Sequence, residues 1–157
     1  MPPPPDFDLQ SAHHYFSAQC FNQAWELIKK PDRTPEEDET MISLSHASRY
    51  HWTQRKEYSP TNASIANWQL ARIYTIVGRL EQARHYASLC LQSSREAGVE
   101  AVFLGYAYEA LARVERLDGN EEQAQKYVAA ALQQAEKAED EEDRQVLLDD
   151  LVDLRAD

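Results

Sequence analysis

The sequence predicts an all-α fold of about seven helices, and three observations lead to this expectation. No proline follows Pro60, so residues 61–157 lack the residue that breaks helices most effectively. Apolar residues recur at steps of three and four, as on one face of a helix, while β-branched residues are sparse and no alternating run persists. Glycines divide this pattern at Gly78, Gly98 and Gly119, and glycine commonly ends a helix.

The first 56 residues predict two helices behind a proline-rich start. Residues 1–8 hold four consecutive prolines and are expected to be disordered. The first helix is expected over 9–30, with an inward stripe of Phe16, Cys20, Ala24 and Leu27. The second begins at Thr34, because Thr34, Pro35 and Glu37 fit the N-cap, N1 and N3 positions of a capping box, and it runs to about Lys56. Residues 59–62 are expected to form a linker.

Five further helices are predicted over 63–77, 80–97, 99–117, 120–138 and 141–155. The three glycines end the third, fourth and fifth of the seven helices, and Asn120 caps the sixth. In the seventh helix, leucines are expected to face inward and aspartates outward; these residues are Leu147, Leu148, Leu151 and Leu154, and Asp149, Asp150 and Asp153.

An internal repeat becomes visible when the chain is shifted by 41 residues. Residues 65–97 then lie over 106–138 with 12 identities in 33 positions. The shared spacing has a physical reason, because small alanines at equivalent positions let two helices approach closely, and glycine allows the tight turn between them. We therefore expect the helix pairs 63–97 and 99–138 to have the same structure.

At these residues the chain resembles the tetratricopeptide repeat family. The resemblance rests on Leu70, Ala71, Tyr74, Gly78, Glu81 and Ala83, and on the copies Leu111, Ala112, Gly119, Glu122 and Ala124. It implies a short right-handed α-α superhelix in a single domain over 9–157, with 9–56 as a degenerate helix pair and 141–155 as a capping helix. The chain departs from the family in its 41-residue period, in the missing Trp and closing Pro, and in Glu115, which stands where Tyr74 stands in the first copy. Residues 36–52 are also similar to small bacterial proteins of this type whose role is uncharacterised.

The resemblance implies a concave binding groove formed by the first helix of each pair. Its residues would be Ile65, Trp68, Arg72, Thr75, Tyr106, Glu109, Arg113 and Arg116. Arginines bind carboxylates bidentately, so a peptide with an acidic side chain or a C-terminal carboxylate is the expected ligand. Trp68 and Glu109 stand where the family's carboxylate clamp has Lys and Asn. The alternative is that Arg72 and Arg113 pair internally with Glu109 or Glu115.

A second candidate site is the polar middle of the second helix, with His46, Arg49 and His51. Three interpretations stay open: a buried network with satisfied hydrogen bonds, a ligand pocket, or acid–base chemistry. No metal site or cofactor is expected, because His13, His14 and Cys20 on the first helix do not face one another. Cys90 aligns with an alanine and is interpreted as a small core residue.

The charge distribution limits the partners. The net charge is −11, and residues 115–157 hold 14 acids against 5 bases. This excludes a basic footprint for nucleic acid and disfavours an acidic membrane surface. The start of the chain has no basic or apolar stretch typical of a signal peptide, and the two cysteines make no disulfide framework, so a cytoplasmic location is expected.

Taken together, the sequence favours a non-catalytic scaffold or adaptor that binds a protein or peptide segment. A small-ligand sensor or enzyme that uses His46, Arg49 and His51 is the alternative. Self-association through an uncapped flank is a third expectation.

Overall fold

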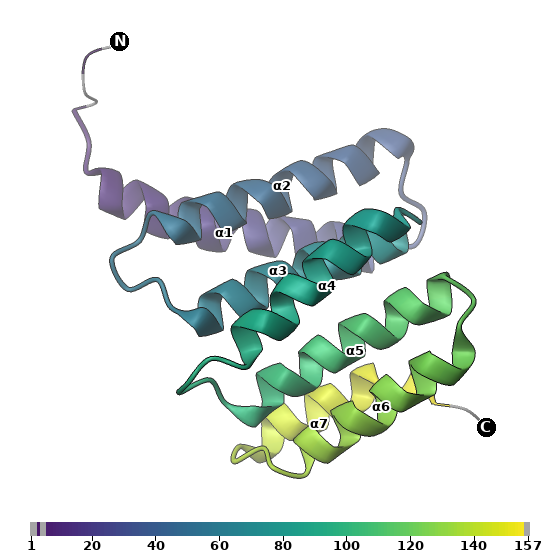
Figure 1. Ribbon diagram of the computed structural model, residues 1–157. Helices are drawn as coiled ribbons and strands as arrows, with labels where there is room; N and C mark the ends of the chain where they lie inside the picture. Colours follow the sequence, from purple (N-terminus) through teal and green to yellow (C-terminus); the bar gives the residue numbers. More distant parts are fainter. Residues whose placement is uncertain (1–2, 4–5, 156–157) are drawn as a thin grey trace. The chain divides into compact units, whose positions relative to one another are not determined.

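The computed structural model describes residue 3 and residues 6–155, and over this range it is all-helical (Figure 1). Seven α-helices and one 3-10 turn are present, and the described residues contain no strand, as the sequence predicts. The helices group into two compact units, residues 1–59 and 60–157. Much of the expected disordered start lies outside the described residues. Among the residues described, no helix combines the length and apolar character needed to cross a membrane.

The first unit is a pair of helices, α1 (Leu9–Lys29) and α2 (Pro35–Thr53). Asp8 caps α1 by accepting a hydrogen bond from the Ser11 amide at 2.8 Å. The predicted capping box of α2 is confirmed: the Glu37 amide donates to Thr34 Oγ1 at 3.2 Å, and the Thr34 amide donates to Glu37 Oε2 at 2.9 Å. The N-termini of α1 and α2 are therefore both capped by side chains that are close to them in sequence.

The buried face of α1 is formed by small residues, Ser17, Cys20 and Ala24. The predicted stripe was wrong at Phe16, which is 44% exposed, and Leu27 is only half-buried. Small side chains let α1 and α2 approach closely, and the larger rings are left at the edge of the contact. The second helix also ends earlier than predicted, at Thr53 rather than Lys56.

The second unit begins with two helix pairs of identical length. The first pair is α3 (Pro60–Ile76) and α4 (Leu80–Ser94), and the second is α5 (Ala101–Leu117) and α6 (Glu121–Ala135). Each boundary of the second pair lies 41 residues after its counterpart, which is the period of the sequence repeat. The predicted linker over 59–62 was wrong, because Pro60 is the first residue of α3, a position that suits its fixed φ and missing N–H.

The turns inside the two pairs have the same backbone structure. Gly78 and Gly119 have φ angles of 72° and 79°, in the left-handed region that glycine tolerates. The residue after each glycine bonds back to the preceding helix: the Arg79 amide donates to Tyr74 O at 2.9 Å, and the Asn120 amide donates to Glu115 O at 2.8 Å. These bonds define a Schellman end at both sites, so the expected likeness of the two turns is confirmed.

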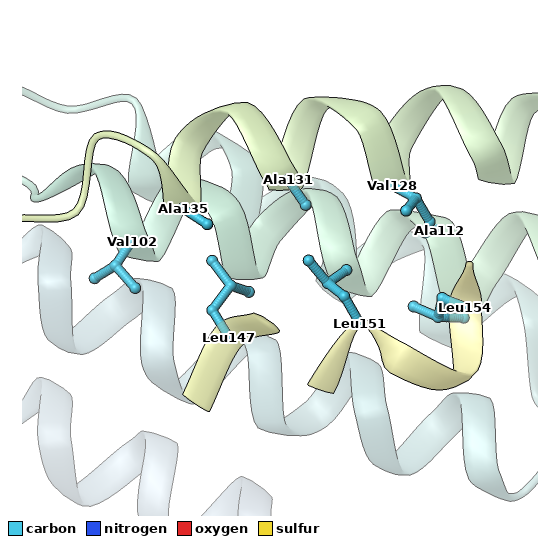
Figure 2. Packing of buried hydrophobic residues seen from close by; sticks show 8 residues of the cluster. All are labelled: Val102, Ala112, Val128, Ala131, Ala135, Leu147, Leu151 and Leu154. Atoms are coloured by element: carbon cyan, nitrogen blue, oxygen red, sulfur yellow. The ribbon is translucent and has the colours of Figure 1, made fainter. Parts of the chain in front are cut away.

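The C-terminal segment consists of α7 (Glu141–Asp150) and the 3-10 turn η1 (Val152–Leu154), so the predicted seventh helix is broken at Leu151. Leu147, Leu151 and Leu154 are each at most 1% exposed. In Figure 2 they point toward α5 and α6, where the cluster is completed by Val102, Ala112, Val128, Ala131 and Ala135. The leucine face of this segment is therefore confirmed as the inward face, whereas Leu148 is half-buried.

Candidate functional site

The carboxylate of Glu109 is the centre of the predicted groove. Its side chain is fully buried on α5. Trp68 Nε1 donates to Oε2 at 2.8 Å, Arg72 Nη1 donates to Oε1 at 2.8 Å, and Arg113 Nε also donates to Oε1. A buried carboxylate needs such partners, and three charge-assisted or indole hydrogen bonds supply them. Of the two internal partners considered in the sequence, Glu109 is the one that both arginines use.

Glu115, the other internal partner considered, belongs to a separate contact. It is buried near the C-terminal end of α5 and pairs with Arg84 of α4. Arg84 also donates to Asp118 Oδ2 at 2.8 Å, in the turn that follows α5. This contact joins the two helix pairs and does not reach the arginines of the predicted groove.

The two arginines of α5 hold the C-terminal segment. Arg113 Nη1 donates to Asp153 Oδ2 at 2.8 Å, and Arg113 Nη2 donates to the Asp150 carbonyl at 2.7 Å. Arg116 Nη2 donates to the Leu154 carbonyl at 2.9 Å. Carbonyls at the end of a helix lack partners within the helix, and these guanidinium groups supply donors for the carbonyls of Asp150 and Leu154.

The arginine contacts follow the sequence repeat. Arg72 on α3 binds Glu109 on α5, which is the first helix of the following pair. Arg113 on α5 binds the Asp153 carboxylate and the backbone carbonyl of Asp150. Arg72 and Arg113 are 41 residues apart, and so are Glu109 and Asp150. The C-terminal segment thus takes the place that the first helix of a further repeat would have.

Burial and hydrogen bonding shift the pKa values of Asp150 and Asp153 in opposite directions. The hydrogen bond from Arg113 lowers the pKa of Asp153, whereas burial, followed by the nearby Glu109 carboxylate, raises the pKa of Asp150. Burial and then the charge of Asp150 also raise the pKa of the Tyr106 hydroxyl. Burial alone would lower the pKa of Arg113, but Glu109 and Asp153 keep it above its usual value. The Arg113 guanidinium and the Asp153 carboxylate are therefore ionised at neutral pH.

The other predicted groove residues make local contacts. The rings of Trp68 and Tyr106 pack edge to face with centroids 5.4 Å apart. Thr75 Oγ1 donates to the Ala71 carbonyl at 2.8 Å within α3, and Ile65 is half-buried on the same helix. Nothing in these contacts tests peptide binding, which stays a prediction.

The polar cluster of α2 separates into two environments. Burial, followed by the charge of Arg49, lowers the pKa of His46. His51 instead lies against α1, where His51 Nδ1 and His13 Nδ1 are 2.8 Å apart and the ring of Phe16 is 5.3 Å away. Burial and the neighbouring His13 lower the pKa of His51.

The buried serines of α2 support the interpretation of a satisfied polar network. Ser48 Oγ donates to the Ser17 carbonyl at 2.7 Å. Ser17 Oγ donates to the His14 carbonyl at 3.0 Å and accepts from Arg55 Nη1 at 3.1 Å. Each hydroxyl at this point of the α1–α2 contact has a partner, as buried polar groups require.

The contact between His13 and His51 was missed in the sequence. The two residues lie 38 positions apart on different helices, so no spacing within one helix reveals them. The described residues contain no group of three or more histidine, cysteine, aspartate or glutamate side chains arranged to hold a metal ion. Cys20 and Cys90 are buried free thiols, and burial raises the pKa of Cys90 to about 12, in keeping with its interpretation as a core residue.

Comparisons with family models, curated proteins and solved structures find no match to this chain.

Proposed function

We propose that the chain is a non-catalytic, protein-binding scaffold whose TPR-like helix pairs form a short right-handed superhelix. Its ligand is an acidic segment of a partner protein. The observation that supports this most directly is the way Arg113 and Arg116 hold the chain's own acidic C-terminal segment, through carboxylate and carbonyl oxygens. The contact is an internal example of the recognition that we propose.

Arg72 is the residue through which a partner would bind. It has the same repeat position as Arg113, but within the described part of the chain it donates one hydrogen bond, to Glu109, whereas Arg113 donates to Glu109, Asp153 and the Asp150 carbonyl. The Arg72 side chain is 20% exposed and that of Arg113 is 11% exposed. A guanidinium has five N–H donors, so Arg72 keeps donors with which to bind a partner carboxylate bidentately.

The chemistry of the partner follows from the same comparison. The C-terminal segment supplies leucines to the apolar face, and acids and carbonyls to the arginines. A partner segment that brings carboxylates and unpaired carbonyls to Arg72 would repeat the polar part of this contact. The free thiols Cys20 and Cys90 support a reducing compartment, which we propose to be the cytoplasm.

The test is direct binding with purified components. A partner captured by the wild-type chain is titrated against the wild type, Arg72→Gln and Arg95→Gln; Arg95 is exposed at the end of α4 and serves as the matched control. Loss of a charge-assisted contact of about 1.5–3 kcal/mol predicts at least about tenfold weaker binding by Arg72→Gln. Equal affinities for all three proteins, or the absence of saturable binding, would contradict the proposal.

A further inference from the structure

We propose that His13 of α1 and His51 of α2 form a two-histidine chelate for a divalent transition-metal ion, with Cu²⁺ and Ni²⁺ as the best-fitting ions. The site lies within the first unit and is independent of the proposed groove. It rests on the position of the two ring nitrogens, whose Nδ1 atoms are 2.8 Å apart. Imidazole nitrogen is the most common protein ligand for such ions.

The separation of the nitrogens selects the coordination geometry. Metal–imidazole bonds are about 2.0–2.1 Å long, so two nitrogens 2.8 Å apart subtend roughly 85–90° at a bound ion. This is the angle between neighbouring ligands in a square or octahedral site. Tetrahedral zinc would need the nitrogens roughly 3.3–3.4 Å apart. The geometry therefore favours Cu²⁺ and Ni²⁺, which accept tetragonal arrangements, over Zn²⁺.

The protonation state of the pair suits metal binding. Two Nδ1 atoms at hydrogen-bond distance share one proton, with one ring as donor and the other as acceptor. On binding, the donor ring carries its proton on Nε2 instead of Nδ1, so both Nδ1 lone pairs reach the ion and no net proton is released.

The surroundings hold the rings in place and leave one side open. Tyr50 packs edge-on against both His13 and His51, and Phe16 packs on His51. Both histidines are half-buried, whereas Tyr50 is 58% exposed and Phe16 is 44% exposed. Water completes the coordination from the exposed side. Two protein ligands define an exchangeable site rather than a closed structural one.

The experiment is a titration of full-length protein without a histidine tag, first stripped of metal with a chelator. Cu²⁺, Ni²⁺ and Zn²⁺ are titrated separately by isothermal calorimetry into the wild type, His13→Asn and His51→Asn. His14→Asn and His85→Asn are the matched controls; His14 neighbours the site but pairs with Glu57, and His85 is exposed on α4. Circular dichroism spectra establish that each variant is folded, and His13→Gln replaces His13→Asn if that variant does not fold.

We expect one Cu²⁺ per chain, with an electron paramagnetic resonance spectrum of the bound Cu²⁺ that shows two nitrogen ligands. Because loss of even a second-layer partner commonly costs about 10–100-fold in metal affinity, either site variant should bind at least about tenfold more weakly, with both controls unchanged. Ni²⁺ should bind more tightly than Zn²⁺. Unchanged affinity of His13→Asn, no saturable binding by the wild type, or preference for Zn²⁺ over Ni²⁺ would overturn the proposal, and the pair would then be a hydrogen bond between imidazoles only.

Discussion

Substitution of Gly105 by alanine tests how closely the C-terminal helix α7 packs against α5. Gly105 lies inside α5, in its second turn, where the backbone is helical and needs no special φ. A Cβ atom at this position would lie 2.5 Å from Leu147 Cδ2 and 3.4 Å from Gln134 Cβ. Leu147 is fully buried among α5 and α6 residues, so its methyl group has little room to move. Gly105 is thus required by the close approach of α7.

Two opposing terms set the expected effect. Replacing a mid-helix glycine by alanine stabilises a helix by about 1 kcal/mol, whereas inserting a methyl group into a packed core costs about 1–3 kcal/mol. Gly105→Ala should therefore lower the free energy of unfolding by roughly 0–2 kcal/mol. Leu147→Ala should cost about 2.7–5 kcal/mol, the range for buried leucines that leave a cavity. In the Leu147→Ala background the clash disappears, so adding Gly105→Ala should recover about 1 kcal/mol.

The assay is equilibrium urea unfolding of the four proteins in this cycle, followed by circular dichroism and tryptophan fluorescence. Ala129→Gly calibrates the helix term, because Ala129 is exposed in the middle of α6 and its replacement should cost about 1 kcal/mol without a packing change. The sign of the Gly105→Ala effect should reverse between the two backgrounds. If Gly105→Ala stabilises both backgrounds by the same amount, α7 is not seated against Gly105 and the reasoning is refuted.

Two further predictions concern titration. Asp153→Asn should cost less than about 1 kcal/mol near pH 7, because the Asp153 side chain is 65% exposed. The hydrogen bond from Arg113 lowers the pKa of Asp153, so the stabilisation by this pair is present above the unfolded pKa of 3.8 and is lost as the pH falls through the lower folded pKa. The free energies of urea unfolding of Asp153→Asn and wild type should therefore differ near pH 7 and agree below pH 3. A difference that stays constant over this pH range would count against the pair. In Cys20→Ala, the thiol Cys90, with a pKa of about 12, should react with a disulfide reagent at pH 8 far more slowly than in urea, and equal rates would show that it is accessible.

The helices could be predicted because their signals are local. The capping box at Thr34 and the glycine turns that end α3 and α5 depend on residues within one or two turns. Pro60 was misassigned because it lacks the local support that Pro35 has. Glu37 follows Pro35 and closes a capping box, whereas no acidic residue follows Pro60 within the first turn. The segment around Pro60 was therefore interpreted as a linker, although Pro60 also occupies the first position of a helix.

The buried face of α1 could not be predicted from hydrophobicity, because the helix carries apolar residues on both faces. The ring of Tyr15 lies opposite the small residues Ser17, Cys20 and Ala24, and the ring of Phe16 lies at the edge of the α1–α2 contact beside His51. Transfer free energy favours burial of the rings, but close helix packing favours the small residues, and the partner helix decides between them. That partner presents the buried Ser48, whose hydroxyl donates to the Ser17 carbonyl across the contact.

The two arginines Arg72 and Arg113 show why equal sequence positions do not give equal roles. Their spacing and chemistry predicted either a ligand or an internal acid, and both options use the same charge-assisted contacts. The hydrogen bonds of each arginine depend on the segment that packs beside its helix on the C-terminal side of the repeat. Arg113 is followed by α7 and η1, where the Asp153 carboxylate and the Asp150 carbonyl accept its hydrogen bonds, whereas Arg72 is followed by α5, whose Glu109 accepts from it. Because a helix end exposes carbonyls and a helix interior does not, α7 and η1 offer Arg113 more acceptors than α5 offers Arg72, and the remaining donors of Arg72 are the ones that we propose for a partner.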